Sequence, residues 1–124
     1  MTETAVTATL DKMALEPVLL DVSKQSSYTD FILIVSARSD RQVQAICDHV
    51  VKQIKEAHGR APLSVEGKKE GQWALIDYGS FVVHVFYHPT RVRYDLEGLW
   101  HDAHRVPVEI PSESRIQVSD AYSL

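Results

Sequence analysis

The stretch that decides the fold is Gly71–Ala103, GQWALIDYGSFVVHVFYHPTRVRYDLEGLWHDA. It predicts two neighbouring strands, Gln72–Asp77 and Phe81–Tyr87, because β-branched and aromatic residues dominate both runs. The short loop between them contains Gly79, which tolerates a positive φ, so we expect a hairpin. Apolar and aromatic residues then recur at helical spacing within Thr90–Trp100, which predicts a short helix.

The clearest helix lies between Ser39 and Gly59. Ser39 and Gln42 are spaced as a capping box, which would satisfy two unpaired amides at the helix start, and Gly59 supplies the stop. Cys47 falls on the apolar stripe of this helix, so we expect a small buried core residue rather than a nucleophile. The stripe that should pack against a sheet consists of Val43, Ile46, Cys47, Val50, Ile54 and Ala57.

Three further strands are expected at Val18–Val22, Phe31–Val35 and Pro62–Val65. Phe31–Val35 is uninterrupted and apolar, which predicts a central strand covered on both faces. Residues 1–15 are weakly helical, and Pro17 should end that helix, because the residue before a proline is pushed out of the helical region. Helices and strands therefore alternate, which predicts an α/β (α+β) class with a mixed five-stranded sheet flanked by helices.

Length and composition indicate one domain. With 124 residues we expect a single domain over residues 1–106, followed by an extended or disordered tail at 107–124 that contains Pro107 and Pro111. The lone cysteine allows no intrachain disulfide and fits a reducing compartment. No run approaches the length of a membrane span and the first residues lack the features of a signal or transit peptide, so we expect a cytoplasmic protein.

Charge bears on the class of partner. The formal net charge is -4 and the pI is near 5.8, which argues against broad, charge-driven binding of nucleic acid. A general RNA-binding domain would also show steep salt dependence. A local basic patch stays compatible with these totals, but the whole-chain charge favours a partner other than nucleic acid.

Catalytic and metal-binding patterns are weak. His84 and His88 share one strand face, and Asp77 on the neighbouring strand could approach His84, but no Cys/His cluster has zinc spacing. The sequence contains no glycine-rich phosphate loop and no Gly-x-Ser-x-Gly elbow. We therefore expect no metal, no cofactor and no catalytic residue. The alternative is a small nucleotidyltransferase-like enzyme that uses Asp77 with magnesium.

The aromatic residues have two readings. Trp73 and Asp77 share one face of their strand, and Tyr94 and Trp100 lie on the last predicted helix with arginines and carboxylates between them. Trp, Tyr and Arg are the usual anchors of a protein interface. Tryptophans also fill cores, and the residues alone leave both readings open. On these grounds the chain is a small α/β domain, and we interpret it as a binding module.

A set of motifs in order adds a resemblance. Arg-Gln-Val, Glu-Gly, Val-His-Val-Phe and Tyr-x-Leu-Glu-x-Leu-Trp together are specific, although any one alone is not. The chain resembles the Iojap family, also called ribosomal silencing factor RsfS, from about Val18 to Ala103. The matching pieces are Thr29–Phe31, Ser39–Ile46, Glu66–Gly67, Trp73–Gly79, Val82–Phe86 and Arg91–Trp100.

The resemblance implies a nucleotidyltransferase-like fold without known catalysis. It implies binding to the large ribosomal subunit through ribosomal protein fourteen at the intersubunit face, which blocks joining of the small subunit and lowers translation when nutrients are scarce. It also allows a homodimer. Carried onto this sequence, the motif positions predict a partner surface made of Trp73, Asp77, His84, Tyr94, Glu97 and Trp100.

Overall fold

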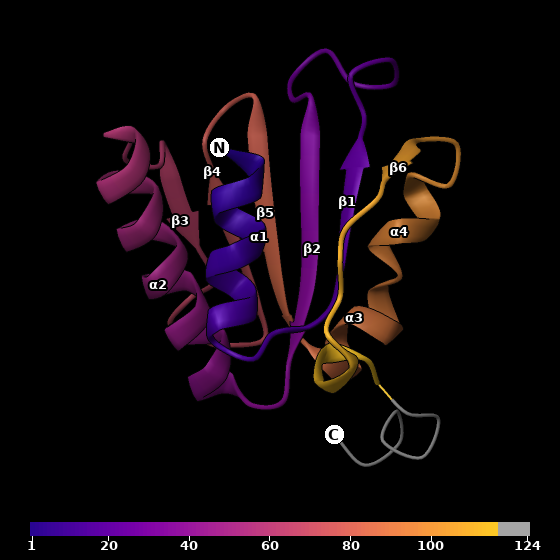
Figure 1. Cartoon of the computed structure of the whole chain (residues 1–124). Helices are drawn as coiled ribbons and strands as arrows, with labels where there is room; N and C mark the ends of the chain where they lie inside the picture. The colour runs from indigo at the N-terminus through magenta and orange to yellow at the C-terminus, as the bar shows by residue number, and fades with distance from the viewer. Residues whose placement is uncertain (117–124) are drawn as a thin grey trace.

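The computed structural model describes residues 1–116, which form one mixed six-stranded sheet with helices on both faces (Figure 1). The strands are β1 (Leu15–Asp21), β2 (Phe31–Ala37), β3 (Ser64–Glu66), β4 (Trp73–Asp77), β5 (Phe81–Tyr87) and β6 (His104–Val106). The helices are α1 (Thr2–Asp11), α2 (Asp40–His58), α3 (His88–Tyr94) and α4 (Leu96–Leu99), with a 3-10 turn at Ser112–Ser114. The predicted α/β class is confirmed.

The sheet is built around one parallel pair. Its strand order is β3-β4-β5-β2-β1-β6, and β2 and β5 run parallel while every other neighbouring pair is antiparallel. Ile32–Ala37 are buried, which confirms the prediction of a central strand covered on both faces. The hairpin of β4 and β5 is also confirmed, with Trp73 opposite Phe86 and Asp77 opposite Val82.

The sheet has six strands rather than the predicted five. The additional strand, β6, pairs antiparallel with β1 through three residues, from Leu19 opposite Val106 to Asp21 opposite His104. A run this short has no alternation of its own, and it becomes a strand only because the edge of β1 offers free backbone groups. The prediction failed here because the pairing joins segments more than 80 residues apart.

Helix α2 carries the predicted apolar stripe, and five of its residues, Cys47 among them, are buried. Ser39 is the N-cap, and its hydroxyl oxygen accepts a hydrogen bond from the Gln42 amide at 3.1 Å. The reciprocal half of the capping box is wrong, because the Gln42 side-chain oxygen accepts from the Arg38 amide at 2.6 Å. Gly59 ends the helix in the left-handed conformation at φ +68°, as predicted.

The predicted helix over Thr90–Trp100 is wrong as a single element. The structure divides it into α3 and α4, because Asp95 adopts a left-handed conformation with φ +46°. The Asp95 amide donates to the Arg91 carbonyl and closes the last turn of α3. Periodicity over this stretch does not reveal the break, since Leu96, Leu99 and Trp100 keep a spacing that one continuous helix would also give.

The N-terminal prediction about Pro17 is also wrong. Helix α1 ends at Asp11, and Met13 turns the chain with φ +63°. Strand β1 then begins at Leu15 and includes Pro17, with a shift of register between Leu15 and Val18. Proline lacks an amide donor and is tolerated at such a bulge, so it lies inside the strand instead of ending the helix.

Two apolar layers hold the sheet. Helices α1 and α2, side by side in Figure 1, cover one face and pack on the inward residues of β2, β4 and β5. Leu96 of α4 packs on the other face with Phe86 and Ile34, and Trp73 and Trp100 border this second core. The six residues predicted for the partner surface all lie on this second face or on the segments that cover it.

Residues 107–116 follow β6 along the body. Val108 packs against the first core, Ser114 is buried, and the Ile116 amide donates to the Glu16 carboxylate at 2.8 Å. Residues 117–124 of the predicted tail lie outside the described residues. Within residues 1–116, no helix is both long enough and apolar enough to cross a membrane.

Gly71 is a point of close approach, and we expect Gly71→Ala to destabilise the fold by about 2–3 kcal/mol. Its φ is +70°, and a Cβ atom there would lie 2.8 Å from the Asp40 Cα atom at the start of α2. The left-handed conformation alone costs about 1–2 kcal/mol for a residue with a side chain, and the contact with Asp40 adds to it. Urea denaturation measures the free energy of unfolding.

The matched control is Gly59→Ala, because Gly59 has a similar φ of +68° and a Cβ atom added there would meet no other atom within 4 Å. It should cost only the conformational part, about 1–2 kcal/mol. Equal losses of unfolding free energy in the two variants would show that the close approach of Asp40 to Gly71 does not affect stability.

Candidate protein-binding surface

Four rings gather where β4, β5 and α3 meet. Trp73, the first residue of β4, stacks on Phe86 with ring centroids 4.8 Å apart, and it contacts Tyr94 at 5.2 Å. The ring of His84 lies 6.0 Å from Trp73 and 6.2 Å from Phe86. We call Trp73, His84, Phe86 and Tyr94 the aromatic cluster. Cross-strand pairing of Trp73 with Phe86 places the rings, and the last turn of α3 adds Tyr94.

Trp73 and His84 are joined by a hydrogen bond. The indole Nε1–H donates to His84 Nδ1 at 3.0 Å. Burial lowers the pKa of His84 to about 4, because the charged imidazolium loses its hydration there. At neutral pH the ring is therefore uncharged, and its Nδ1 is the acceptor of the indole proton.

The cluster is only partly covered. Trp73 is half-buried, and Tyr94 is 54% exposed. Helices α3 and α4 expose two further apolar residues, Val92 at 62% and Leu99 at 75%. Trp100 is half-buried against the second core. Each tryptophan thus packs against the second core and stays partly exposed, so the core role is confirmed and the interface role stays a prediction.

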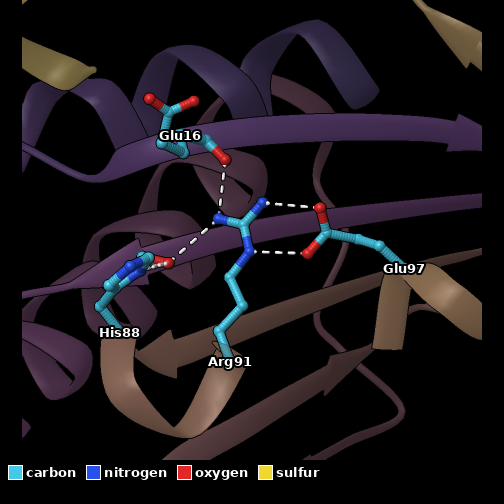
Figure 2. A network of polar contacts seen from close by, with 5 residues as sticks. Glu16, His88, Arg91 and Glu97 are labelled. Carbon is cyan, nitrogen blue, oxygen red and sulfur yellow. Dashed lines mark hydrogen bonds and ion pairs between the residues drawn. The ribbon is translucent and has the colours of Figure 1, made fainter. Parts of the chain in front are cut away.

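A buried polar network holds α3 and α4 against the sheet (Figure 2). Arg91 Nε and Nη2 donate to the two carboxylate oxygens of Glu97 at 2.8 and 3.2 Å. Arg91 Nη1 donates to the Glu16 carbonyl at 2.8 Å and to the Ser36 hydroxyl at 3.0 Å. Ser36 also lies 2.9 Å from His88 Nδ1. One guanidinium thereby connects α3, α4, β1 and β2.

Burial shapes the titration of this network. Desolvation alone would raise the pKa of Glu97, but the hydrogen bonds and charge of Arg91 outweigh it, and the pKa is lowered. Burial, followed by the nearby Arg91 charge, lowers the pKa of His88. A neutral His88 leaves Arg91 and Glu97 as the charged pair of the network, and their bidentate geometry is the strongest arrangement for such a pair.

The six residues predicted for the partner surface fall in different places. Trp73, His84 and Tyr94 meet in the aromatic cluster, and Trp100 borders the same core. Glu97 is engaged by Arg91. Asp77 lies at the far end of β4, where its Oδ1 accepts a hydrogen bond from the Gly79 amide at 2.7 Å and fixes the hairpin turn.

Sequence reasoning missed the buried role of Arg91. It also missed Ser36 and the carbonyl of Glu16 as partners of that arginine, and His88 as a partner of Ser36. Arg91 was visible only as one of several charges on a predicted helix, and the five residues are spread from position 16 to position 97. Arg91 and Glu97 are close in sequence, but they are six residues apart. Side chains meet on one helix at a separation of three or four residues, so the spacing gave no sign of their ion pair.

Nothing among residues 1–116 groups three histidine, cysteine or carboxylate side chains in a way that could hold a metal ion. Cys47 is buried as predicted, and burial raises its pKa to about 12. A cavity of about 660 Å³ lies between α2 and the segment that follows β3, and its lining includes Cys47, Val51 and Lys68. Asp77 does not line this cavity, so the carboxylate of the enzymatic alternative is not brought to it.

Comparison with known proteins identifies the family. The sequence model described as "Ribosomal silencing factor during starvation", RsfS, matches residues 1–123. The chain belongs to the RsfS family. A relative from Halalkalibacterium halodurans named ribosomal silencing factor RsfS is 42% identical over 105 residues, which cover 85% of this chain and 89% of the relative. The resemblance found in the motifs is therefore confirmed.

Two further proteins are similar to this chain, one in structure and one in sequence. A crystal structure of a Chromobacterium violaceum protein is similar at a TM-score of 0.78 and 31% identity, over 90% of this chain and 91% of that one. A mouse protein named mitochondrial assembly of ribosomal large subunit protein 1 is 34% identical over 66% of this chain and 37% of its own length. The name of a silencing factor describes a regulatory protein rather than an enzyme.

We expect Glu97→Gln to lower the free energy of unfolding by about 2 kcal/mol, because Arg91 would keep its charge and lose a charged acceptor in a buried position. Chemical denaturation at neutral pH measures the loss. Glu109→Gln is the control, since Glu109 is exposed and forms no ion pair within residues 1–116; it should change stability by less than about 0.5 kcal/mol. Similar stabilities for the two variants would show that the ion pair of Arg91 with Glu97 does not stabilise the fold.

His84 should make the fold sensitive to mild acid. Its pKa is about 4 in the folded protein and about 6.5 when unfolded, so the unfolded chain binds more protons between these values. This contribution, on the order of 3 kcal/mol, is fully present above pH 6.5 and is lost as the pH falls toward 4. Denaturation curves of the wild type and His84→Gln across this range should converge toward acid pH, whereas parallel pH profiles would refute the assignment.

Proposed function

We propose that this protein binds the large ribosomal subunit through ribosomal protein fourteen at the intersubunit face, and that it represses translation by blocking subunit joining. The observation that carries the proposal is the partly exposed aromatic cluster beside α3 and α4, in a chain that belongs to the RsfS family. The mechanism is steric: an occupied contact excludes the other subunit, and no bond is made or broken.

The chemistry of the cluster suits a protein partner. Exposed Trp and Tyr side chains backed by a firm core are the usual hot spots of protein interfaces. Trp73 is held by Phe86 and His84, so little side-chain freedom would be lost on binding. Arg93 lies 5.5 Å from the centre of the Tyr94 ring and adds a cation at the same place.

Charge supports ribosomal protein rather than ribosomal RNA as the docking site. The chain has a formal net charge of -4, which the phosphate backbone would repel and a basic ribosomal protein would attract. The mouse relative is named for assembly of the ribosomal large subunit, which agrees with that subunit as the partner. We place this action in the cytoplasm and extend the proposal to a homodimer of the free protein, which light scattering can test.

The six predicted residues take two roles in this proposal. We assign Trp73, His84, Tyr94 and Trp100 to direct contact, because they form or adjoin the aromatic cluster. Glu97 supports the surface indirectly through Arg91, and Asp77 does so by fixing the β4–β5 turn.

Cosedimentation tests the function directly. Purified protein is mixed with separated ribosomal subunits, and subunit joining is then allowed in its presence and absence. We expect the protein to travel with the large subunit and to reduce the fraction of joined ribosomes. Protein that stays at the top of the gradient at low and moderate salt would overturn the proposal.

Tyr94→Ala should weaken binding to the large subunit by about 2 kcal/mol, roughly thirtyfold, as truncation of an interface hot spot does. Because Tyr94 is 54% exposed, the melting temperature should change little. Tyr28→Ala is the matched control, since Tyr28 is 91% exposed in the connection between β1 and β2 and is not part of the aromatic cluster. Equal binding by the two variants would remove Tyr94 from the interface.

A further inference from the structure

His84 occupies an unusual position on the second face of the sheet. It lies opposite Leu75 of β4 and beside Ile34 of β2, at the border between the part covered by α4 and the open part. Leu75 and Val82 are half-buried, and neither packs against the second core. A polar ring is thus placed among apolar side chains that no other element covers completely.

The hydrogen bond from Trp73 decides which nitrogen of His84 carries the proton. An indole N–H is only a donor, so Nδ1 must present its lone pair to it at 3.0 Å. A neutral imidazole has one proton, which must then be on Nε2. Stacking on Phe86, with 15° between the ring planes, holds the ring in this orientation.

Within residues 1–116, the ring of His84 forms one hydrogen bond, at Nδ1, and its Nε2–H group has no acceptor. It is also not sealed inside the fold. Among the described residues that are not exposed, one side-chain polar atom is both fully buried and without a hydrogen-bond partner, and it is the Tyr78 hydroxyl. The Nε2 atom of His84 has no partner either, so it cannot be fully buried. The Nε2 atom of His84, a residue that is 8% exposed, therefore keeps some contact with solvent.

We propose that His84 determines specificity by donating its Nε2–H to an uncharged carbonyl oxygen of the bound protein. This inference rests on the proposed function and adds to it a defined chemical requirement at one point of the interface. Trp73 is then a positioning residue as well as an apolar contact, because its indole N–H fixes the tautomer that makes His84 a donor.

The surroundings favour a carbonyl over other groups. When a partner covers Leu75, Val82 and Trp73, water leaves the Nε2–H group, and an unpaired donor there would weaken binding. A lysine or arginine of the partner offers no acceptor. A carboxylate would lose its hydration on binding, and the two arginines of α3 already have partners, Arg91 in Glu97 and Arg93 in the Tyr94 ring. A neutral acceptor matches the neutral donor at the lowest desolvation cost.

Two variants of His84 separate its nitrogens. Asn carries an amide oxygen near the Nδ1 position, so His84→Asn keeps an acceptor for Trp73 and removes the outward donor. Gln places its amide nitrogen near the Nε2 position, so His84→Gln keeps the outward donor and gives up the Nδ1 acceptor. Both variants are compared with the wild type by melting temperature and by titrated cosedimentation with separated large subunits.

We expect His84→Asn to bind about tenfold more weakly than the wild type, as loss of one desolvated hydrogen bond implies. We expect His84→Gln to stay within about threefold of the wild type. Binding of folded His84→Asn at wild-type strength would overturn the inference and leave the proposed function intact. Failure of the wild type to bind would instead overturn the proposed function.

A measurement on the wild type needs no variant and decides the tautomer if a variant fails to fold. Nitrogen-15 NMR of the imidazole distinguishes protonated from unprotonated ring nitrogens. We expect the proton of His84 on Nε2 in the free protein, and slower exchange of that proton when purified ribosomal protein fourteen is added. A proton on Nδ1, or unchanged exchange in a complex that forms, would refute the donor role.

A double-mutant cycle separates the two kinds of acceptor oxygen. With a carbonyl acceptor, replacing any exposed Asp or Glu of ribosomal protein fourteen by Ala should leave the ratio of wild-type to His84→Asn affinity unchanged. A ratio that falls to about one for one of these replacements would identify a carboxylate acceptor and would overturn the choice of a neutral one.

Discussion

A buried guanidinium is costly unless its donors are matched, and the position of α3 and α4 follows from how Arg91 meets that condition. Glu97 supplies the opposite charge, Ser36 supplies a hydroxyl from the central strand, and Glu16 supplies a carbonyl from β1. The three partners come from three elements, so the requirement of one side chain fixes their relative placement. Apolar packing of Leu96 and Trp100 then fills the layer that this polar frame defines.

This frame explains why aromatic residues can stay partly exposed without disordering the surface. The α3–α4 segment is short and its second helix has only four residues, so propensity alone would not keep it in place. The ion pair of Arg91 with Glu97 bridges the break at Asp95, and Tyr94 at that break leans on Trp73. A surface built this way is preorganised, which would lower the ordering cost of the binding proposed above.

Local chemistry determined what could be predicted from the sequence. Ser39 and Gly59 delimit α2, and the apolar runs reveal the central strand and the β4–β5 hairpin, because each of these signals lies within a few residues. The missed features depend on distant segments. Strand β6 exists because β1 offers an edge, Pro17 is accommodated by a bulge, and the partners of Arg91 are scattered along the chain. The split at Asp95 is local but leaves the apolar spacing unchanged, so periodicity could not detect it.

The parallel pairing of β2 with β5 has a consequence for the order in which the molecule assembles. Phe31 pairs with Phe81, so a loop of about 50 residues must close before the centre of the sheet exists. Contacts of such long range slow folding, because the entropy of loop closure must be lost before they form. The aromatic cluster is built on β5 and on segments that follow or flank it. During synthesis, the chain can present this cluster only after Tyr94 has left the ribosomal tunnel. The aromatic cluster is thus a product of completed folding, and partly made chains do not display it.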